Sequence, residues 1–139
     1  MAKDLYHTIV RNALIKDGWT ITHDPLRLED NDRNMKYEAD LGAEKLFAAE
    51  KGEEKIAVEI KSFLKSSVPN EFHGILGQYL TYFDALIALE SDRILILAIP
   101  LNAYHRLENY PFILYLIEKH KIKTVIFDEF SETIVTWKK

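Results

Sequence analysis

Two charged residues, Glu59 and Lys61, close an otherwise apolar stretch in the middle of the chain. The stretch 56–63 reads IAVEIKSF, which predicts a buried β-strand. Because successive side chains of a strand point to opposite faces, we expect Glu59 and Lys61 on one face and Val58 and Ile60 on the other. Burying a charge is costly unless it is paired or binds a metal ion. The pair therefore indicates a functional carboxylate–ammonium site.

A second carboxylate, Asp40, lies upstream, where another strand is expected to begin. An aspartate beside a Glu-x-Lys strand is what a Mg²⁺-dependent phosphodiester hydrolase needs. A hairpin turn near Gly52 would put Glu59 across from about Glu44 or Lys45, so Glu44 stays open as the alternative second carboxylate. We favour Asp40 because a shorter side chain suits a tight octahedral Mg²⁺ site.

Two further polar residues, Gln78 and Tyr82, lie four positions apart in a segment with helical periodicity. Residues with this spacing share one helical face, so the two side chains can act together. The alternative interpretation of Glu59 and Lys61 is a surface ion pair, which contributes little free energy. The apolar flanks, the upstream aspartate and the Gln–Tyr spacing together favour the catalytic type of site.

The remaining pattern predicts alternating helices and strands around this site. Helices are expected over 4–16, 71–90, 101–108 and 111–121, strands over 19–22, 37–49, 55–63, 93–100, 124–127 and 133–137, and a polar loop over 29–34. The long helix is expected to bury Phe72, Ile75, Leu76, Tyr79, Leu80, Phe83 and Ile87. This order indicates an α/β fold, a mixed sheet flanked by helices, in one domain spanning residues 1–139.

Composition limits the classes of protein that fit. The 139 residues include 22 acidic and 18 basic side chains, and the net charge of -4 argues mildly against non-specific coating of DNA. The absence of cysteine excludes disulfides and thiolate metal sites. The apolar runs are too short to cross a bilayer, and the N-terminus does not look like a signal segment, so a cytoplasmic protein is expected.

The set Asp40, Glu59, Lys61, Gln78 and Tyr82 resembles the site of the PD-(D/E)xK nuclease superfamily, especially its RecB-like and Holliday-junction-resolvase branch. The expected α-β-β-β-α-β order over roughly residues 4–100 is similar to the core of that superfamily, with a C-terminal helix and β-hairpin added. The resemblance implies a restriction-endonuclease-like core and a Mg²⁺ or Mn²⁺ ion held by two carboxylates and the Ile60 carbonyl. In such a site Lys61 would act on water and phosphate, Gln78 would steady the attacking side, and Tyr82 would support Lys61.

A closer resemblance covers almost the whole chain. The segments 12–25, 40–45 and 56–63, which read NALIKDGWTITHDP, DLGAEK and IAVEIKSF, are similar to the XisH family. Proteins of that family are cyanobacterial controlling factors for excision of the fdxN element, a DNA segment removed during heterocyst differentiation. The resemblance implies an accessory role in site-specific recombination, with DNA, a recombinase and the small companion protein XisI as partners.

Three functions follow from these observations and stay open. The first is a metal-dependent DNA endonuclease, and the second is a non-catalytic recombination factor that binds DNA or the recombinase. The third is an interaction subunit for an XisI-like companion, with a vestigial acidic site. The apolar and aromatic segment 104–137 further indicates a homodimer, since surplus apolar surface usually marks an interface.

Overall fold

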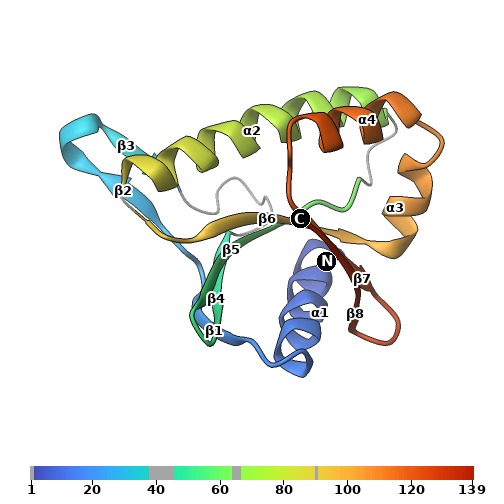
Figure 1. The fold of residues 1–139 in the computed structure, drawn as a ribbon, viewed down its shortest axis with the longest axis horizontal. Coiled ribbons are helices and arrows are strands. Elements are labelled where there is room, and N and C mark those ends of the chain that lie inside the picture. Colours follow the sequence, from blue (N-terminus) through green and yellow to red (C-terminus); the bar gives the residue numbers. More distant parts are fainter. Residues whose placement is uncertain (1, 38–45, 64–66, 90) are drawn as a thin grey trace.

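A six-stranded mixed sheet runs through the centre of the protein (Figure 1). The computed structural model describes residues 2–37, 46–63, 67–89 and 91–139. In spatial order the strands are β1 (Thr20–His23), β4 (Phe47–Lys51), β5 (Glu54–Ile60), β6 (Ile94–Pro100), β7 (Thr124–Asp128) and β8 (Thr133–Lys138). The central strands β5, β6 and β7 are parallel, and the pairs toward both edges are antiparallel. The predicted mixed sheet is confirmed.

Helices cover both faces of this sheet, α1 on one side and α2 with α4 on the other (Figure 1). The helices are α1 (Ala2–Lys16), α2 (Val68–Ala88), α3 (Leu101–Leu107) and α4 (Pro111–Lys119). One core cluster joins α1 to Val58 and Ile60 of β5, and a second joins α2 to Ala57 of the same strand. Because both faces of β5 and β6 are covered, the two strands are apolar along most of their length.

The long helix α2 buries only part of the expected stripe, since Phe72, Ile75 and Tyr79 are buried as predicted. Its buried residues are Val68, Phe72, Ile75, Tyr79, Tyr82, Ala85 and Leu86. The prediction was wrong for Leu80, Phe83 and Ile87, which are 50%, 43% and 60% exposed. These three lie one position beyond buried residues, which is about 100° around a helix. The helix is apolar over more than one face, so periodicity alone does not select the buried one.

The segment predicted as a polar loop forms a small hairpin instead. Strands β2 (Leu28–Asp30) and β3 (Met35–Tyr37) pair with each other around a short 3₁₀ helix, η1 (Asn31–Arg33). The Asp30 carboxylate accepts a hydrogen bond from the Asp32 amide at 3.0 Å. The expected single strand over 37–49 is therefore also wrong, since β3 belongs to this hairpin and β4 begins at Phe47.

The β4–β5 hairpin has a tighter turn than the sequence indicated. Lys51 pairs with Glu54, so the turn consists of two residues, and Gly52 has a φ of 59°. Left-handed backbone of this kind is favourable for glycine. Because Phe47 pairs with Val58, the position opposite Glu59 falls at residue 46 and not at 44 or 45, which corrects the estimated register.

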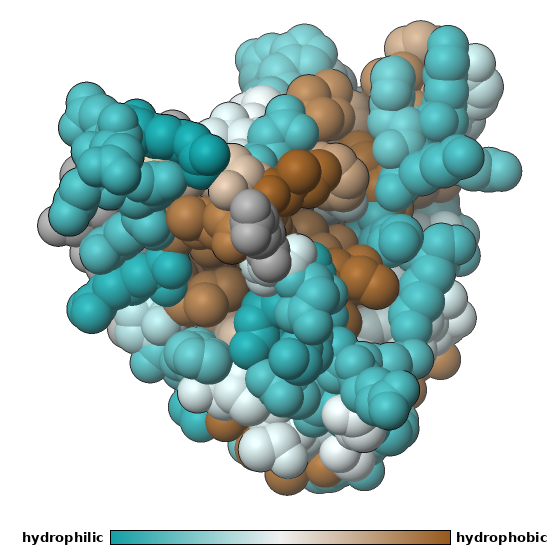
Figure 2. All heavy atoms as spheres, turned by 60° about the vertical axis from the view of Figure 1, so that its left-hand side comes forward, coloured by the Kyte–Doolittle hydropathy of each residue, from teal (hydrophilic) through white to brown (hydrophobic). Residues whose placement is uncertain are grey.

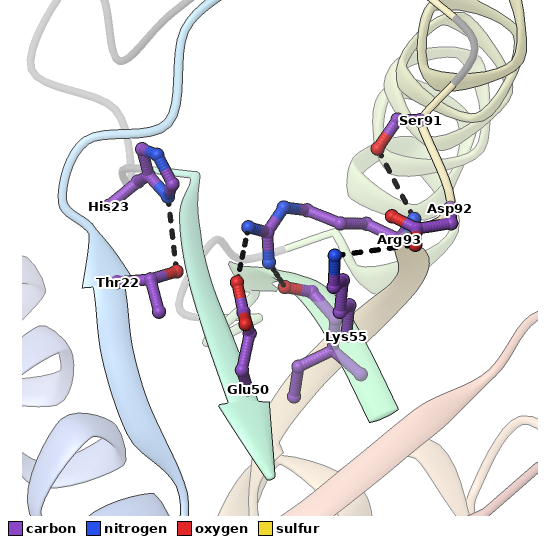
Figure 3. A network of polar contacts seen from close by, with 8 residues as sticks. Thr22, His23, Glu50, Lys55, Ser91, Asp92 and Arg93 are labelled. Atoms are coloured by element: carbon purple, nitrogen blue, oxygen red, sulfur yellow. Dashed lines mark hydrogen bonds and ion pairs between the residues drawn. The ribbon is translucent and has the colours of Figure 1, made fainter. Parts of the chain in front are cut away.

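A polar network ties together the ends of β4, β5 and β6 that lie away from Glu59 (Figure 3). Arg93 Nη2 lies 2.8 Å from Glu50 Oε2, and Arg93 Nη1 donates to the Ile56 carbonyl at 3.4 Å. Beside them, Lys55 Nζ lies 3.4 Å from Asp92 Oδ2. This network fixes the three strands at one end, and the candidate site lies at the other end of β5.

Within the described ranges, no helix has the length and apolarity required to cross a bilayer.

Candidate functional site

Glu59 and Lys61 form a buried ion pair at the end of β5. The Lys61 Nζ atom lies 2.9 Å from Glu59 Oε1, and the side chains are 9% and 1% exposed. Glu59 pairs along the ladder with Leu97, which packs in the core under α2. The neighbouring Val58 and Ile60 pack in the other core cluster. The strand therefore turns the carboxylate and the ammonium toward α2, as the alternation of side chains requires.

Two residues of α2 extend this pair into a chain of polar contacts. Lys61 Nζ donates to Gln78 Oε1 at 2.6 Å, and Gln78 Nε2 donates to the Tyr82 hydroxyl at 3.1 Å. The spacing of four positions places both α2 side chains over the end of β5. Tyr82 is 7% exposed and belongs to the core. The structure thus brings four predicted residues together: Glu59, Lys61, Gln78 and Tyr82.

The backbone after Lys61 is held by an arginine that sequence reasoning missed. Arg106 of α3 donates from Nη2 to the Ser62 carbonyl at 2.9 Å and also to the Phe63 carbonyl. Phe63 is buried and has a φ of 53°, a left-handed conformation that a bulky residue rarely adopts. This bend explains why β5 ends at Ile60 and does not reach residue 63 as predicted. A lone arginine on a short helix gave no signal in the sequence.

The candidate metal ligands are described only in part. Asp40 and its alternative Glu44 lie outside the described residues. Ile60 is fully buried at the end of β5. No group of three or more His, Asp or Glu side chains suited to a metal ion occurs within the described ranges. Glu59 fits one ligand position of a hard cation, because carboxylate oxygens are the ligands that such ions take.

A second polar cluster lies on the α1 side of the sheet. His7 Nε2 lies 2.8 Å from Asp24 Oδ2, and Arg11 Nη1 lies 3.3 Å from the same oxygen. The His7 ring packs edge-on against Phe47, with 5.3 Å between the ring centroids. Phe47 belongs to the core cluster under α1, whereas Glu59 faces α2. His7 is thus part of a different cluster from Glu59.

Tyr79 lies beside Gln78 on α2 and carries a perturbed hydroxyl. Burial raises the pKa of the Tyr79 phenol, and a hydrogen bond with the backbone of Lys123 partly offsets that shift. The phenol is therefore neutral at physiological pH and anchors α2 to the start of β7. This contact helps to fix the helix that positions Gln78 over Lys61.

Comparison with known proteins gives a consistent result. A family model described as XisH protein matches residues 1–135. The chain is similar to the crystal structure of an XisH family protein from Nostoc punctiforme, with 40% identity, a TM-score of 0.85 and coverage of 97% of this chain and 99% of that chain. It is also similar to a fdxN element excision controlling factor protein from Anabaena variabilis, with 41% identity, a TM-score of 0.84 and coverage of 96% and 98%. No curated protein matches this chain.

Proposed function

This chain belongs to the XisH family, and on that premise we propose that it is a controlling factor for the excision of a DNA element, with a metal-dependent endonuclease site at Glu59 and Lys61. The observation that carries the proposal is the buried ion pair, in which the ammonium is held 2.9 Å from the carboxylate and 2.6 Å from Gln78. A buried ion pair is often no more stable than apolar residues of the same volume. The presence of this ion pair at a strand end is therefore better explained by a catalytic role than by a contribution to the stability of the fold.

The proposed ligands of a Mg²⁺ or Mn²⁺ ion are Glu59, the Ile60 carbonyl and Asp40, with Glu44 as the alternative second carboxylate. When bound, such an ion polarises a phosphate and lowers the pKa of a coordinated water. Lys61 Nζ would orient the attacking water or neutralise charge that develops on the phosphate. Gln78 fixes the position of that ammonium, and Tyr82 fixes the orientation of the Gln78 amide.

A nicking assay on supercoiled plasmid and on branched DNA, with Mg²⁺ or Mn²⁺, tests the proposed activity. Weak cleavage is expected from the wild type and none from Lys61→Ala or Glu59→Gln, provided that circular dichroism shows both variants folded. Lys55→Ala is the matched control, because Lys55 lies on the same strand in an exposed ion pair. Equal cleavage by the wild type and Lys61→Ala would show that a contaminant cuts, and would overturn the assignment.

Metal binding is tested separately by titration calorimetry with Mn²⁺. Lys61→Ala is expected to bind the ion nearly as well as the wild type, because an ammonium does not ligate a cation. Glu59→Ala is expected to abolish binding. Loss of binding in Glu44→Ala but not in Asp40→Ala would move the second ligand to Glu44, and unchanged binding in Glu59→Ala would refute the site.

A second function, a non-catalytic subunit of the excision machinery, is supported by the exposed apolar face of α2. Leu80, Phe83 and Ile87 lie on that face. Figure 2, which brings the C-terminal part of α2 forward, shows hydrophobic surface gathered in a hollow between hydrophilic projections. If no variant cuts DNA in the presence of a recombinase and an XisI-like companion, while Lys61→Ala still supports excision, this function replaces the endonuclease.

The proposed partners are DNA, a site-specific recombinase, an XisI-like companion and a second copy of the chain. Exposed aromatic residues favour self-association, since Phe112, Tyr115 and Phe130 are 68%, 52% and 90% exposed. Analytical ultracentrifugation at micromolar concentration should then show a dimer. A monomer under these conditions would contradict the homodimer.

A further inference from the structure

A cavity separate from the Glu59–Lys61 site opens among α3, α4 and the β7–β8 hairpin. Its volume is about 610 Å³, within the range of small-molecule sites. Its apolar lining consists of Ile99, Leu107, Leu114, Ile117 and Ile122. A hollow of this size and lining suits the apolar body of a small organic molecule.

Lysines surround this apolar hollow. Lys121, Lys123, Lys138 and Lys139 line it together with one acidic side chain, Glu118. None of these lysines forms an ion pair within the part of the chain that the structure describes. The local excess of positive charge contrasts with the net charge of -4 of the whole protein. The cavity therefore offers uncompensated positive charge around an apolar interior.

One of these lysines is held in place by an aromatic side chain of the cavity wall. Lys138 Nζ lies 5.2 Å from the centroid of the Tyr104 ring, and both residues line the cavity. A cation over an aromatic ring is attracted by the negative face of the ring. The contact favours a position of the Lys138 ammonium at the wall of the cavity, although the residue itself is exposed.

The cavity lies on the same side of the sheet as Glu59. The ladder pairs Glu59 with Leu97, Leu97 with Thr124, and Thr124 with Lys138, so these residues form one row across four strands. Thr124, which lines the cavity, is two strands from Glu59, or about 10 Å. Helix α3 contributes Tyr104 to the cavity and Arg106 to the backbone that follows Lys61. The two sites are neighbours with separate linings.

We infer that this cavity binds a small organic anion, an apolar or aromatic body that carries a carboxylate or a phosphate. The apolar body would fill the hollow, and its anionic group would lie among Lys121, Lys123 and Lys138. A neutral apolar molecule would bind less tightly, because it would lack the attraction between an anionic group and the lysines. A nucleic-acid backbone would gain little from the hollow, since its evenly spaced phosphates are joined by polar sugars and need a continuous basic surface.

The test uses 1-naphthoate as the probe and 1-naphthalenemethanol as its neutral analogue. Titration calorimetry should show naphthoate binding at least ten times more tightly than the neutral analogue. The Lys123→Gln/Lys138→Gln variant should weaken naphthoate binding about tenfold and leave binding of the alcohol unchanged. Lys51→Gln/Lys55→Gln is the matched control, with the same loss of charge on strands far from the cavity, and should bind naphthoate as the wild type does.

The location of the probe is read from methyl resonances. Naphthoate should shift the signals of Leu114, Ile117 and Ile122, and not those of Leu80 and Ile87 on the exposed face of α2. Equal binding of acid and alcohol, no binding, or shifts confined to α2 would overturn the inference. Shifts caused by a 20-base-pair DNA duplex but not by naphthoate would assign the lysines to nucleic acid and also overturn it. None of these variants alters Glu59 or Lys61, so failure here is distinguishable from failure of the proposed endonuclease.

Discussion

Lys61 and Gln78 join the end of β5 to α2 through a 2.6 Å hydrogen bond from the ammonium to the side-chain amide oxygen. Because the oxygen of Gln78 accepts from the lysine, its NH₂ group is left to donate to Tyr82. The amide therefore has one orientation, and it holds the ammonium beside Glu59. A charged group that is fixed in this way does not need to reorganise during a reaction, which is the condition for effective electrostatic stabilisation.

Removal of the Lys61 ammonium should strongly destabilise the fold. Lys61→Met leaves the Glu59 carboxylate buried without its counter-charge, and loss of one partner of a buried pair costs about 3 kcal/mol. The Glu59→Gln/Lys61→Met double variant should recover most of this loss, because no buried charge remains. Urea unfolding at pH 7 measures both values. A double variant less stable than Lys61→Met would contradict this account of the pair.

Arg106 should stabilise the bend that follows Lys61. Its guanidinium donates to the carbonyls of Ser62 and Phe63, and a lysine cannot reproduce that planar arrangement. Arg106→Lys is therefore expected to lower the free energy of unfolding by about 1–2 kcal/mol. Arg33→Lys is the control, because Arg33 is 56% exposed and donates to a single backbone carbonyl, that of Ala88, beside its ion pair with Asp30. It should change stability by about 0.5 kcal/mol or less. Equal losses in the two variants would argue against a special role for Arg106.

Much of the architecture could be predicted from local patterns. The apolar runs of β5 and β6 reflect burial on both faces, and the first helix ends at Lys16 as expected, shortly before Gly18 with its φ of 95°. The side-chain alternation that placed Glu59 and Lys61 on one face is a property of any strand. Gln78 and Tyr82 were found because their spacing of four is a property of any helix.

The rest depends on contacts between distant segments. Helix α2 is apolar on more than one side, so only the sheet decides that Tyr82 is buried while Phe83 is 43% exposed. No basic patch is visible in the sequence, because Lys123 and Lys138 are 15 positions apart and come together only through the antiparallel pairing of Thr124 with Lys138. The hydrogen bonds of Arg106 likewise depend on how α3 packs beside the end of β5.

Two glycines should respond in opposite directions to alanine. Gly77 lies within α2, and an added Cβ would have open space around it, so Gly77→Ala should raise the free energy of unfolding by about 0.5–1 kcal/mol. Gly18 has a φ of 95°, and its added Cβ would lie 3.2 Å from Lys51 Cε. Gly18→Ala should therefore lower the free energy of unfolding by at least about 1 kcal/mol. Thermal unfolding compares the two, and a destabilised Gly77→Ala would show that this face of α2 is already covered in solution.

Asp128 should contribute a stability that acid removes. Its carboxylate accepts hydrogen bonds from the amides of Phe130 at 2.8 Å and Ser131 at 3.3 Å, and these lower the pKa of Asp128 below its ordinary value. A folded-state pKa below the unfolded value of about 3.9 means that the contribution is complete above that pH and is lost as the pH falls through the folded-state pKa. Asp128→Ala should therefore be less stable than the wild type at pH 7, with a difference that shrinks on acidification below about pH 4. Asp128→Asn is the control, because it keeps an acceptor without the charge. The difference in free energy of unfolding between Asp128→Asn and Asp128→Ala should therefore not vary over that range. Urea unfolding at several pH values measures these differences, and a difference between the wild type and Asp128→Ala that did not shrink on acidification would reject the assignment.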